Sequence, residues 1–271
     1  MKVAVPGVNL QLTLERRPTW RFEVARRGAS HTHGATRHAP TTYSGDGLSV
    51  EGRILDALHS ERFDAAYTAG MQTPHNIGGG NLRLHWRVYT CLWAAEQART
   101  LEGDFVECGV NSGIMSRAIC EYLDFARLPK RFFLFDTFQG IPEEQASPEE
   151  REHARSKNAR IYRECYAETK QTFSAFPNVI LVRGKVPETL TSVAIDKVAY
   201  LSIDMNLVLP EIAALEFFWD RLVPGGIVVL DDYAFEGHRQ QHDAINAFAA
   251  RRGVPVYTSP TGQGLIVRPP Y

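Results

Sequence analysis

Cysteine is scarce in this chain of 271 residues. Its four cysteines are far apart in the sequence, and no two of them form a Cys-x-x-Cys pair; they are Cys91, Cys108, Cys120 and Cys165. Zinc sites and disulfide frameworks need cysteines that are closely paired or densely placed. We therefore interpret the four as reduced thiols that are buried as small apolar side chains.

The chain also lacks an excess of charge and a long apolar run. Its 30 Lys and Arg residues balance 31 Asp and Glu residues, for a formal net charge of −1, so it has no general attraction to nucleic acid or to an anionic membrane. No apolar run reaches the length of a membrane span, and the first residues lack the apolar core of a signal peptide. We expect a cytoplasmic protein whose partners include neither nucleic acid nor membrane.

The length and the hydrophobic content of 44% suit one large domain with appendages. Residues 1–50 show no sustained period, are rich in arginine and carry three histidines, which predicts a poorly ordered or loosely docked arm. The histidines could bind a metal, but we favour the alternative that they belong to a solvated loop. Residues 51–100 are predicted to form a helical lid, with helices at 51–66 and 81–99 around the glycine-rich loop Pro74–Gly80, which is either an active-site lid or a flexible connector.

Residues 101–271, the predicted catalytic domain, alternate between short apolar runs and amphipathic segments. Strands are expected at 104–108, 131–135, 178–182, 198–203 and 227–230, with helices at 113–125, 147–176, 210–222 and 239–251. This alternation is typical of a doubly wound α/β fold with a buried parallel sheet. Two closing strands, 254–258 and 264–267, have too short a connection for a crossover helix and should pair antiparallel.

The turn after the first predicted strand, 104–108, lacks the third glycine of a pyrophosphate-binding turn. Gly109 and Gly113 are spaced Gly-x-x-x-Gly, whereas a pyrophosphate-binding turn reads Gly-x-Gly-x-x-Gly. Asp136, which ends the next strand, can accept hydrogen bonds from ribose hydroxyls. The pattern favours S-adenosylmethionine over NAD, with Glu107 near its charged end, while the alternative is a plain strand–helix turn.

Three acidic residues follow two strands that we expect to be neighbours. Asp204 ends the strand 198–203, and Asp231 and Asp232 end the strand 227–230. Carboxylates this close repel one another unless they take up protons or hold a cation. All-oxygen ligation suits Mg²⁺, Mn²⁺ or Ca²⁺ and not zinc. The alternative is that the aspartates cap the following helices.

Several motifs then occur in an order that resembles a known family. They are Gly103–Val110, Leu134–Pro142, Val182–Gly184 with Pro187–Leu190, and Pro224–Gly226 leading to Asp231-Asp232-Tyr233. They look like the macrocin-type sugar O-methyltransferases, which are class I, S-adenosylmethionine-dependent, Mg²⁺-using enzymes with a Rossmann-like seven-stranded sheet. The resemblance implies metal ligation by Asp204, Asp231 and Asp232, and cofactor contacts at Glu107, Gly109 and Asp136. We also expect Cys108, Gly113, Thr137 and Gly184 to belong to the cofactor site. Family precedent also makes a homo-oligomer reasonable.

The sequence departs from the family pattern at one place. Family members commonly carry Asp-Gly-Asp followed by Tyr, whereas this chain has Asp204-Met205-Asn206 followed by Leu207. The neutral Asn206 supports an alternative hypothesis, a non-catalytic binding module with the same fold. A nucleotide-binding oxidoreductase is the remaining alternative, and the glycine spacing and the terminal hairpin speak against it.

The preferred hypothesis is a metal-dependent O-methyltransferase that acts on a hydroxyl of a sugar or a glycosylated small molecule. A base must take the proton of that hydroxyl. The candidates are Asp204 and two histidines after the last parallel strand, His238 and His242, which are four residues apart and share a helical face. Simple surface solvation is the alternative for both histidines.

Overall fold

The computed structural model describes residues 4–5, 8–11, 23–24, 41–77 and 82–270, and the chain divides into two units, 1–39 and 40–271. In the first unit, three short strands form an antiparallel sheet in the order β1-β2-β3: β1 (Ala4–Val5), β2 (Val8–Gln11) and β3 (Glu23–Val24). The three histidines of the predicted arm lie outside the described residues.

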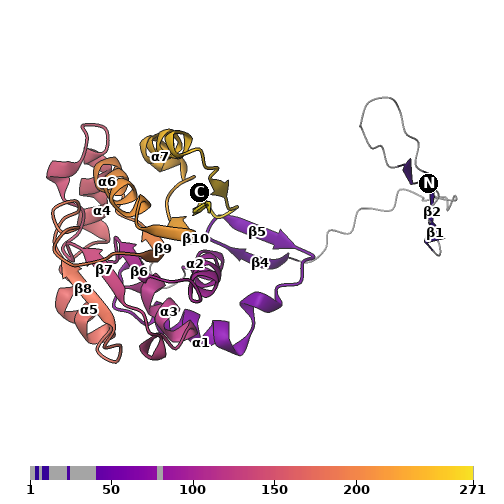
Figure 1. Cartoon of the computed structure of the whole chain (residues 1–271), viewed down its shortest axis with the longest axis horizontal. Helices are drawn as coiled ribbons and strands as arrows, with labels where there is room; N and C mark the ends of the chain where they lie inside the picture. Colours follow the sequence, from indigo (N-terminus) through magenta and orange to yellow (C-terminus); the bar gives the residue numbers. More distant parts are fainter. Residues whose placement is uncertain (1–3, 6–7, 12–22, 25–40, 78–81, 271) are drawn as a thin grey trace. The chain divides into compact units, whose positions relative to one another are not determined.

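The second unit is built on a seven-stranded sheet in the order β11-β12-β10-β9-β6-β7-β8 (Figure 1). Five strands run parallel: β6 (Asp104–Cys108), β7 (Phe132–Asp136), β8 (Val179–Arg183), β9 (Val198–Ile203) and β10 (Leu222–Leu230). The last two, β11 (Tyr257–Thr258) and β12 (Gly264–Val267), pair antiparallel, and β12 is also antiparallel to β10. The predicted doubly wound fold with its closing antiparallel strands is confirmed.

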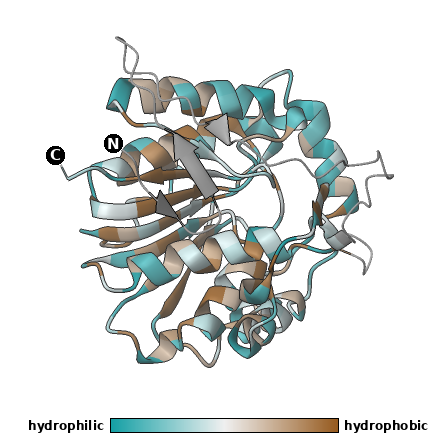
Figure 2. Cartoon of the chain, turned by 90° about the vertical axis from the view of Figure 1, so that its right-hand side faces the viewer, coloured by the Kyte–Doolittle hydropathy of each residue, from teal (hydrophilic) through white to brown (hydrophobic). Residues whose placement is uncertain are grey.

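Helices cover both faces of this sheet, as the apolar strands between more polar helices in Figure 2 show. Alternate strand residues point to opposite cores because successive side chains of a strand face opposite ways. Phe105 and Leu134 belong to the core shared with α1 (Glu61–Met71), α2 (His85–Ala98) and α3 (Ile114–Tyr122). Val106 and Phe135 belong to the core shared with α6 (Val208–Trp219) and α7 (Arg239–Arg252).

The predicted helix 147–176 is two helices. They are α4 (Arg151–Arg160) and α5 (Tyr166–Thr172). Between them the chain leaves the helical path: the Cys165 N–H donates to the Phe138 carbonyl at 3.0 Å instead of to a carbonyl four residues back. The interruption turns Tyr162 toward the ends of the strands, where its hydroxyl lies 3.3 Å from the Asn206 amide nitrogen.

Residues 41–51 form a hairpin of the second unit, although the sequence pattern placed residues up to 50 in the arm. Strands β4 (Thr41–Gly45) and β5 (Leu48–Glu51) are joined by Asp46-Gly47, both with positive φ (51° and 73°), which suits a tight hairpin turn. Tyr43 of this hairpin is buried in the core with α1 and α2. The predicted helix 51–66 is a short 3₁₀ turn, η1 (Asp56–Leu58), followed by α1 from Glu61.

Among the described residues, no helix combines the length and the apolarity that crossing a membrane requires. All four cysteines are buried and unpaired, as the sequence predicted.

Candidate functional site

The carboxyl ends of β6, β9 and β10 lie side by side at one edge of the sheet. The turn after β6 packs closely against Asp204, which follows β9. Gly109, with φ of +90°, lies so near β9 that a Cβ would be 1.9 Å from the backbone oxygen of Asp204. An L side chain would be strained by this φ and blocked by this contact. Gly109 is therefore required for the close approach of the turn to Asp204.

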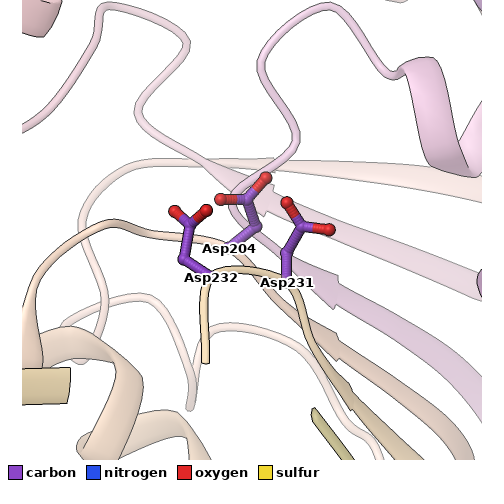
Figure 3. Close-up of side chains that lie close together, drawn as sticks. All are labelled: Asp204, Asp231 and Asp232. Carbon is purple, nitrogen blue, oxygen red and sulfur yellow. The ribbon is translucent and has the colours of Figure 1, made fainter. Parts of the chain in front are cut away.

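The three predicted aspartates converge at this edge (Figure 3). One carboxylate oxygen from each of Asp204, Asp231 and Asp232 lies within 4.8 Å of the others. Burial raises the pKa of Asp204 well above its ordinary value, and the charges of Asp231 and Asp232 raise it further. The predicted proximity is thus present, in a setting where three negative charges need compensation.

Two cations that the sequence pattern did not single out compensate this acidic cluster. Arg87 of α2 donates to Asp231 Oδ2, and its Nε donates to Asp46 Oδ2 of the β4–β5 turn at 2.8 Å. Lys157 of α4 has its Nζ 3.9 Å from Asp232 Oδ2. Gln263 completes the setting of Asp231 by donating to its Oδ1 at 2.9 Å.

Asn206, which stands where the family pattern has a second acid, is held by a network of its own. It is buried, with a positive φ of 62°. Its Nδ2 donates to Asp204 Oδ1 at 3.2 Å, and its Oδ1 accepts from Lys157 Nζ. The amide therefore connects Asp204 to Lys157, a link that a second carboxylate could not make with Asp204.

A large cavity opens beside the cluster, with about 1070 Å³ of space including its mouth. Glu107, Gly109, Asp136, Thr137 and Gly184, five of the predicted cofactor-binding residues, line it, and so do Asp204 and Asp231. Apolar side chains such as Ile77, Leu84, Ile114 and Ile141 form much of its remaining wall. A cavity of this size and mixed lining suits a small-molecule ligand.

Glu107 is the buried acid of this cavity. It is 3% exposed, and its Oε2 has no hydrogen-bond partner among the described residues. Burial raises its pKa well above the ordinary value, and the charges of Asp231 and Asp136 add to the effect. An unpartnered buried carboxylate oxygen is costly unless a ligand supplies a donor.

Asp136 already has a role in shaping the cavity. Its Oδ2 accepts from the backbone N–H groups of Val110 and Asn111 at 2.6 and 2.8 Å, and its Oδ1 accepts from the N–H of Phe138. The carboxylate thereby fixes the glycine turn against the end of β7. Its predicted contact with a ribose stays a prediction.

Two predicted cofactor residues do not line the cavity. Cys108 points into the apolar core beneath α6 and α7. Gly113 is the left-handed N-cap of α3, where a Cβ would be 2.7 Å from the Phe173 ring, so its glycine is needed for packing.

The two candidate histidines are separated. His238 is buried, with Nε2 3.5 Å from Asp232 Oδ2 and 3.5 Å from Lys157 Nζ. His242 is held elsewhere, with Nδ1 3.0 Å from the Tyr233 carbonyl oxygen and its ring against the Tyr233 ring. The structure therefore brings His238, and not His242, next to Asp232, and a catalytic role for either histidine stays a prediction. Of the predicted lid loop, Ile77 lines the cavity, whereas Gly78–Gly80 lie outside the described residues.

Comparison with known proteins assigns the family. Residues 73–258 match the model of the macrocin O-methyltransferase family (TylF). The chain belongs to this family. The match includes the glycine turn, the acidic cluster and the helices around them.

A curated relative and two solved structures agree with the assignment. The chain is 30% identical over 166 residues to the 8-demethyl-8-(2,3-dimethoxy-α-L-rhamnosyl)-tetracenomycin-C 4′-O-methyltransferase of Streptomyces olivaceus, a match that covers 56% of this chain and 60% of the relative. The O-methyltransferase NovP aligns with a TM-score of 0.59 and 23% identity over 68% of this chain and 79% of its own. The calicheamicin methyltransferase CalS11 aligns with a TM-score of 0.55 and 19% identity over 81% and 98%. These two likenesses establish the fold.

Proposed function

We propose that this protein is an S-adenosylmethionine-dependent O-methyltransferase that methylates a hydroxyl of a sugar or a glycosylated small molecule, with Mg²⁺ or Mn²⁺ at Asp204, Asp231 and Asp232. The observation that carries the proposal is the convergence of these carboxylates beside the cavity that contains Glu107. The family assignment and the rhamnose-methylating relative support it.

The cavity fits the methyl donor. Glu107 Oε2 is buried without a partner among the described residues, and the ammonium group at the charged end of the cofactor would supply a donor to it. Asp136 and Thr137 stand at the end of β7, where an adenosine ribose would lie, and Gly109 and Gly184 leave room in the wall. The cofactor supplies the methyl group, and the protein aligns donor and acceptor.

The acidic cluster fits a hard divalent cation because all its donor atoms are carboxylate oxygens. When bound, such a cation would lower the pKa of the acceptor hydroxyl. Arg87 and Lys157 balance part of the charge of the cluster and hold its side chains in place. Of the three candidates for accepting the hydroxyl proton, we favour Asp204 and His238, because His242 contacts Tyr233 instead of the acidic cluster.

The test compares Asp231→Asn with Asp220→Asn, an acid that is three-quarters exposed and outside the cluster. Asp231→Asn should keep binding of S-adenosylhomocysteine in calorimetry and should lose more than about 100-fold in Mg²⁺-dependent methyl transfer to methyl glycosides. Asp220→Asn should retain both. Unchanged transfer by Asp231→Asn would refute the metal site, and failure of wild-type protein to bind S-adenosylhomocysteine would refute the cofactor assignment.

A cofactor-binding module without catalysis is the second candidate, favoured by the neutral Asn206 and its contact with Lys157. It predicts binding of S-adenosylhomocysteine without transfer to any acceptor. An NAD-dependent oxidoreductase is the weakest alternative, and calorimetry with NAD tests it directly. The cytoplasmic location and a homo-oligomeric state stay predictions.

A further inference from the structure

A second cavity lies next to the acidic cluster, between the start of α4 and the 3₁₀ turn η5 (Glu236–His238), which leads into α7. We call it the α4–η5 cavity. Asn206 lines both this cavity and the large one, so that its amide stands between them. The two cavities therefore meet at Asn206, whose amide donates to Asp204 of the acidic cluster.

The chemistry of the two cavities differs. Every side chain that lines the α4–η5 cavity is polar: two imidazoles, three amides, two carboxylates and one guanidinium, with a glycine as the remaining residue. The large cavity has an extensive apolar wall that includes Leu82, Leu84 and Met115. A wall of closely spaced donors and acceptors matches the hydroxyls of a sugar ring, whereas an apolar aglycone could form no hydrogen bonds with it.

His153 of α4 lines this cavity, and its buried ring nitrogen Nε2 has no hydrogen-bond partner among the described residues. Its ring stands nearly perpendicular to that of His238, with the ring centroids 4.9 Å apart. Buried ring nitrogens usually have a hydrogen-bond partner, because burial removes the water that would otherwise bind them. A sugar hydroxyl in the cavity would replace it.

The floor of the cavity is also the edge of the acidic cluster. His238 Nε2 lies 3.5 Å from Asp232 Oδ2, and Asn206 Nδ2 lies 3.2 Å from Asp204 Oδ1. Asp204 and Asp231 also line the large cavity. A hydroxyl bound beside Asn206 would thus approach Asp204 and Asp232, and Asp204 also borders the cavity of the proposed cofactor.

We propose that the α4–η5 cavity binds the sugar ring of the methyl acceptor, with His153 and Asn206 among its polar contacts, while the large cavity holds the cofactor. The proposal rests on the methyltransferase function proposed above and adds where the acceptor lies and which part of it is recognised. The recognised part is the polyhydroxylated ring, and an attached aglycone remains outside the polar wall.

The first test uses the reactivity of a thiol placed at the cavity. All four native cysteines are buried, so a cysteine at the exposed Gln240, which lines the cavity, should react fastest with a maleimide. Gln240→Cys would be labelled in the presence of S-adenosylhomocysteine and Mg²⁺, with and without a panel of methyl glycosides that includes methyl α-L-rhamnoside. Asp243→Cys, on the same helix but outside the cavity, is the matched control.

At saturating sugar, labelling of Gln240→Cys should slow at least about threefold, and labelling of Asp243→Cys should not change. Equal labelling of Gln240→Cys with and without every sugar of the panel would overturn the proposal. So would equal protection at both positions.

The second test replaces the ring nitrogen. His153→Phe keeps the volume and removes the hydrogen bond, and should weaken binding of the protecting sugar about tenfold in saturation-transfer NMR. His59→Phe replaces an exposed histidine that lines neither cavity, and this variant should bind the sugar like wild type. Equal sugar binding by the two variants would contradict the assignment. Calorimetry with S-adenosylhomocysteine separates the cases: intact cofactor binding with no sugar at the cavity refutes this inference alone, and loss of cofactor binding in wild type refutes the proposed function itself.

Discussion

Arg87 offsets part of the negative charge of the acidic cluster in the folded protein. Its guanidinium is largely buried and lies between Asp46 and Asp231, and it packs over the Phe235 ring at 4.8 Å. Three clustered carboxylates would otherwise favour protonation or unfolding. Arg87 thereby fixes the orientation of Asp231 and ties the β4–β5 turn to the site.

Removing this cation should be costly. Arg87→Met leaves Asp231 and Asp46 without their shared partner, and we expect a loss of about 3–5 kcal/mol in the free energy of unfolding, measured by urea denaturation without added metal. Arg251→Met removes a pair with Glu216 in which the arginine is 57% exposed, and should cost less than about 1 kcal/mol. Similar losses in the two variants would show that the Arg87 pair is no more than a surface contact.

The same residue shows what the sequence could predict about the site. Asp204, Asp231 and Asp232 could be predicted to meet because each directly follows one of two strands expected to be neighbours. Arg87, Asp46 and Lys157 could not, because they come from elements whose docking onto the sheet leaves no local pattern. One signal existed: Arg87 lies on α2 between Leu84 and Cys91, on the side of the helix that is otherwise apolar.

The start of α6 is organised by a buried acid in its first turn. Glu211 Oε1 accepts from the backbone N–H groups of Met205 and Asn206 at 3.0 and 2.9 Å, and also from Gln241 Nε2. Burial raises the pKa of Glu211 from 4.5 to about 8, and the charge of Asp232 contributes. At neutral pH the folded protein therefore favours the protonated form of Glu211.

The pH dependence of stability follows from this raised pKa. The folded state binds the proton of Glu211 more tightly than the unfolded state, so the contribution is complete below pH 4.5 and is lost as the pH rises to about 8. In metal-free protein, wild type should lose on the order of a few kcal/mol over this range relative to Glu211→Gln, which stays neutral. Urea denaturation at a series of pH values measures it, and parallel pH profiles for the two proteins would contradict it.

The turn between β6 and α3 should tolerate no side chain at Gly109. Gly109→Ala places a Cβ against the Asp204 backbone at 1.9 Å and should cost at least about 2 kcal/mol of unfolding free energy, while displacing Asp204. Gly237→Ala, where a Cβ would meet nothing within 4 Å, should change stability by less than about 0.5 kcal/mol. If both changes were equally mild, the close approach of the turn to β9 would not be a structural requirement.

Element boundaries were predictable where an apolar period was strong and failed where it was weak. The buried strands β6, β7 and β9 follow their apolar runs closely. The polar segment 147–176 carries too little apolar pattern to reveal its break at 161–165, which depends on a backbone bond to Phe138, a tertiary contact. The Asp46-Gly47 turn was a readable hairpin signal that the basic composition around it obscured.

At the scale of the whole molecule, the order of strands puts the site where it is. Because β6 lies between β9 and β7, the connections after β6 and β9 diverge to opposite faces and leave the edge above them open. The five parallel strands could be predicted from alternation alone, and the antiparallel end from the short connection before β12. Their lateral order depends on packing between the helices and the sheet, which alternation does not specify.

The division of the chain between residues 39 and 40 predicts how shortened chains unfold. Tyr43 donates from its hydroxyl to the Arg83 carbonyl at 2.8 Å, and Asp46 binds Arg87, so the hairpin 41–51 makes its contacts within the unit that starts at Pro40. A chain that begins at Pro40 should therefore unfold within about 2 °C of the full chain in thermal scanning, and a chain that begins at Gly52 should unfold at least about 5 °C lower, because it loses a buried tyrosine and a buried ion pair. Both shortened chains should be compared with Arg87→Met, since the chain from Gly52 leaves Arg87 without Asp46. Equal unfolding temperatures for the two shortened chains would mean that the hairpin adds nothing to the stability of the site, and the link from its turn through Arg87 to Asp231 would then have no energetic role.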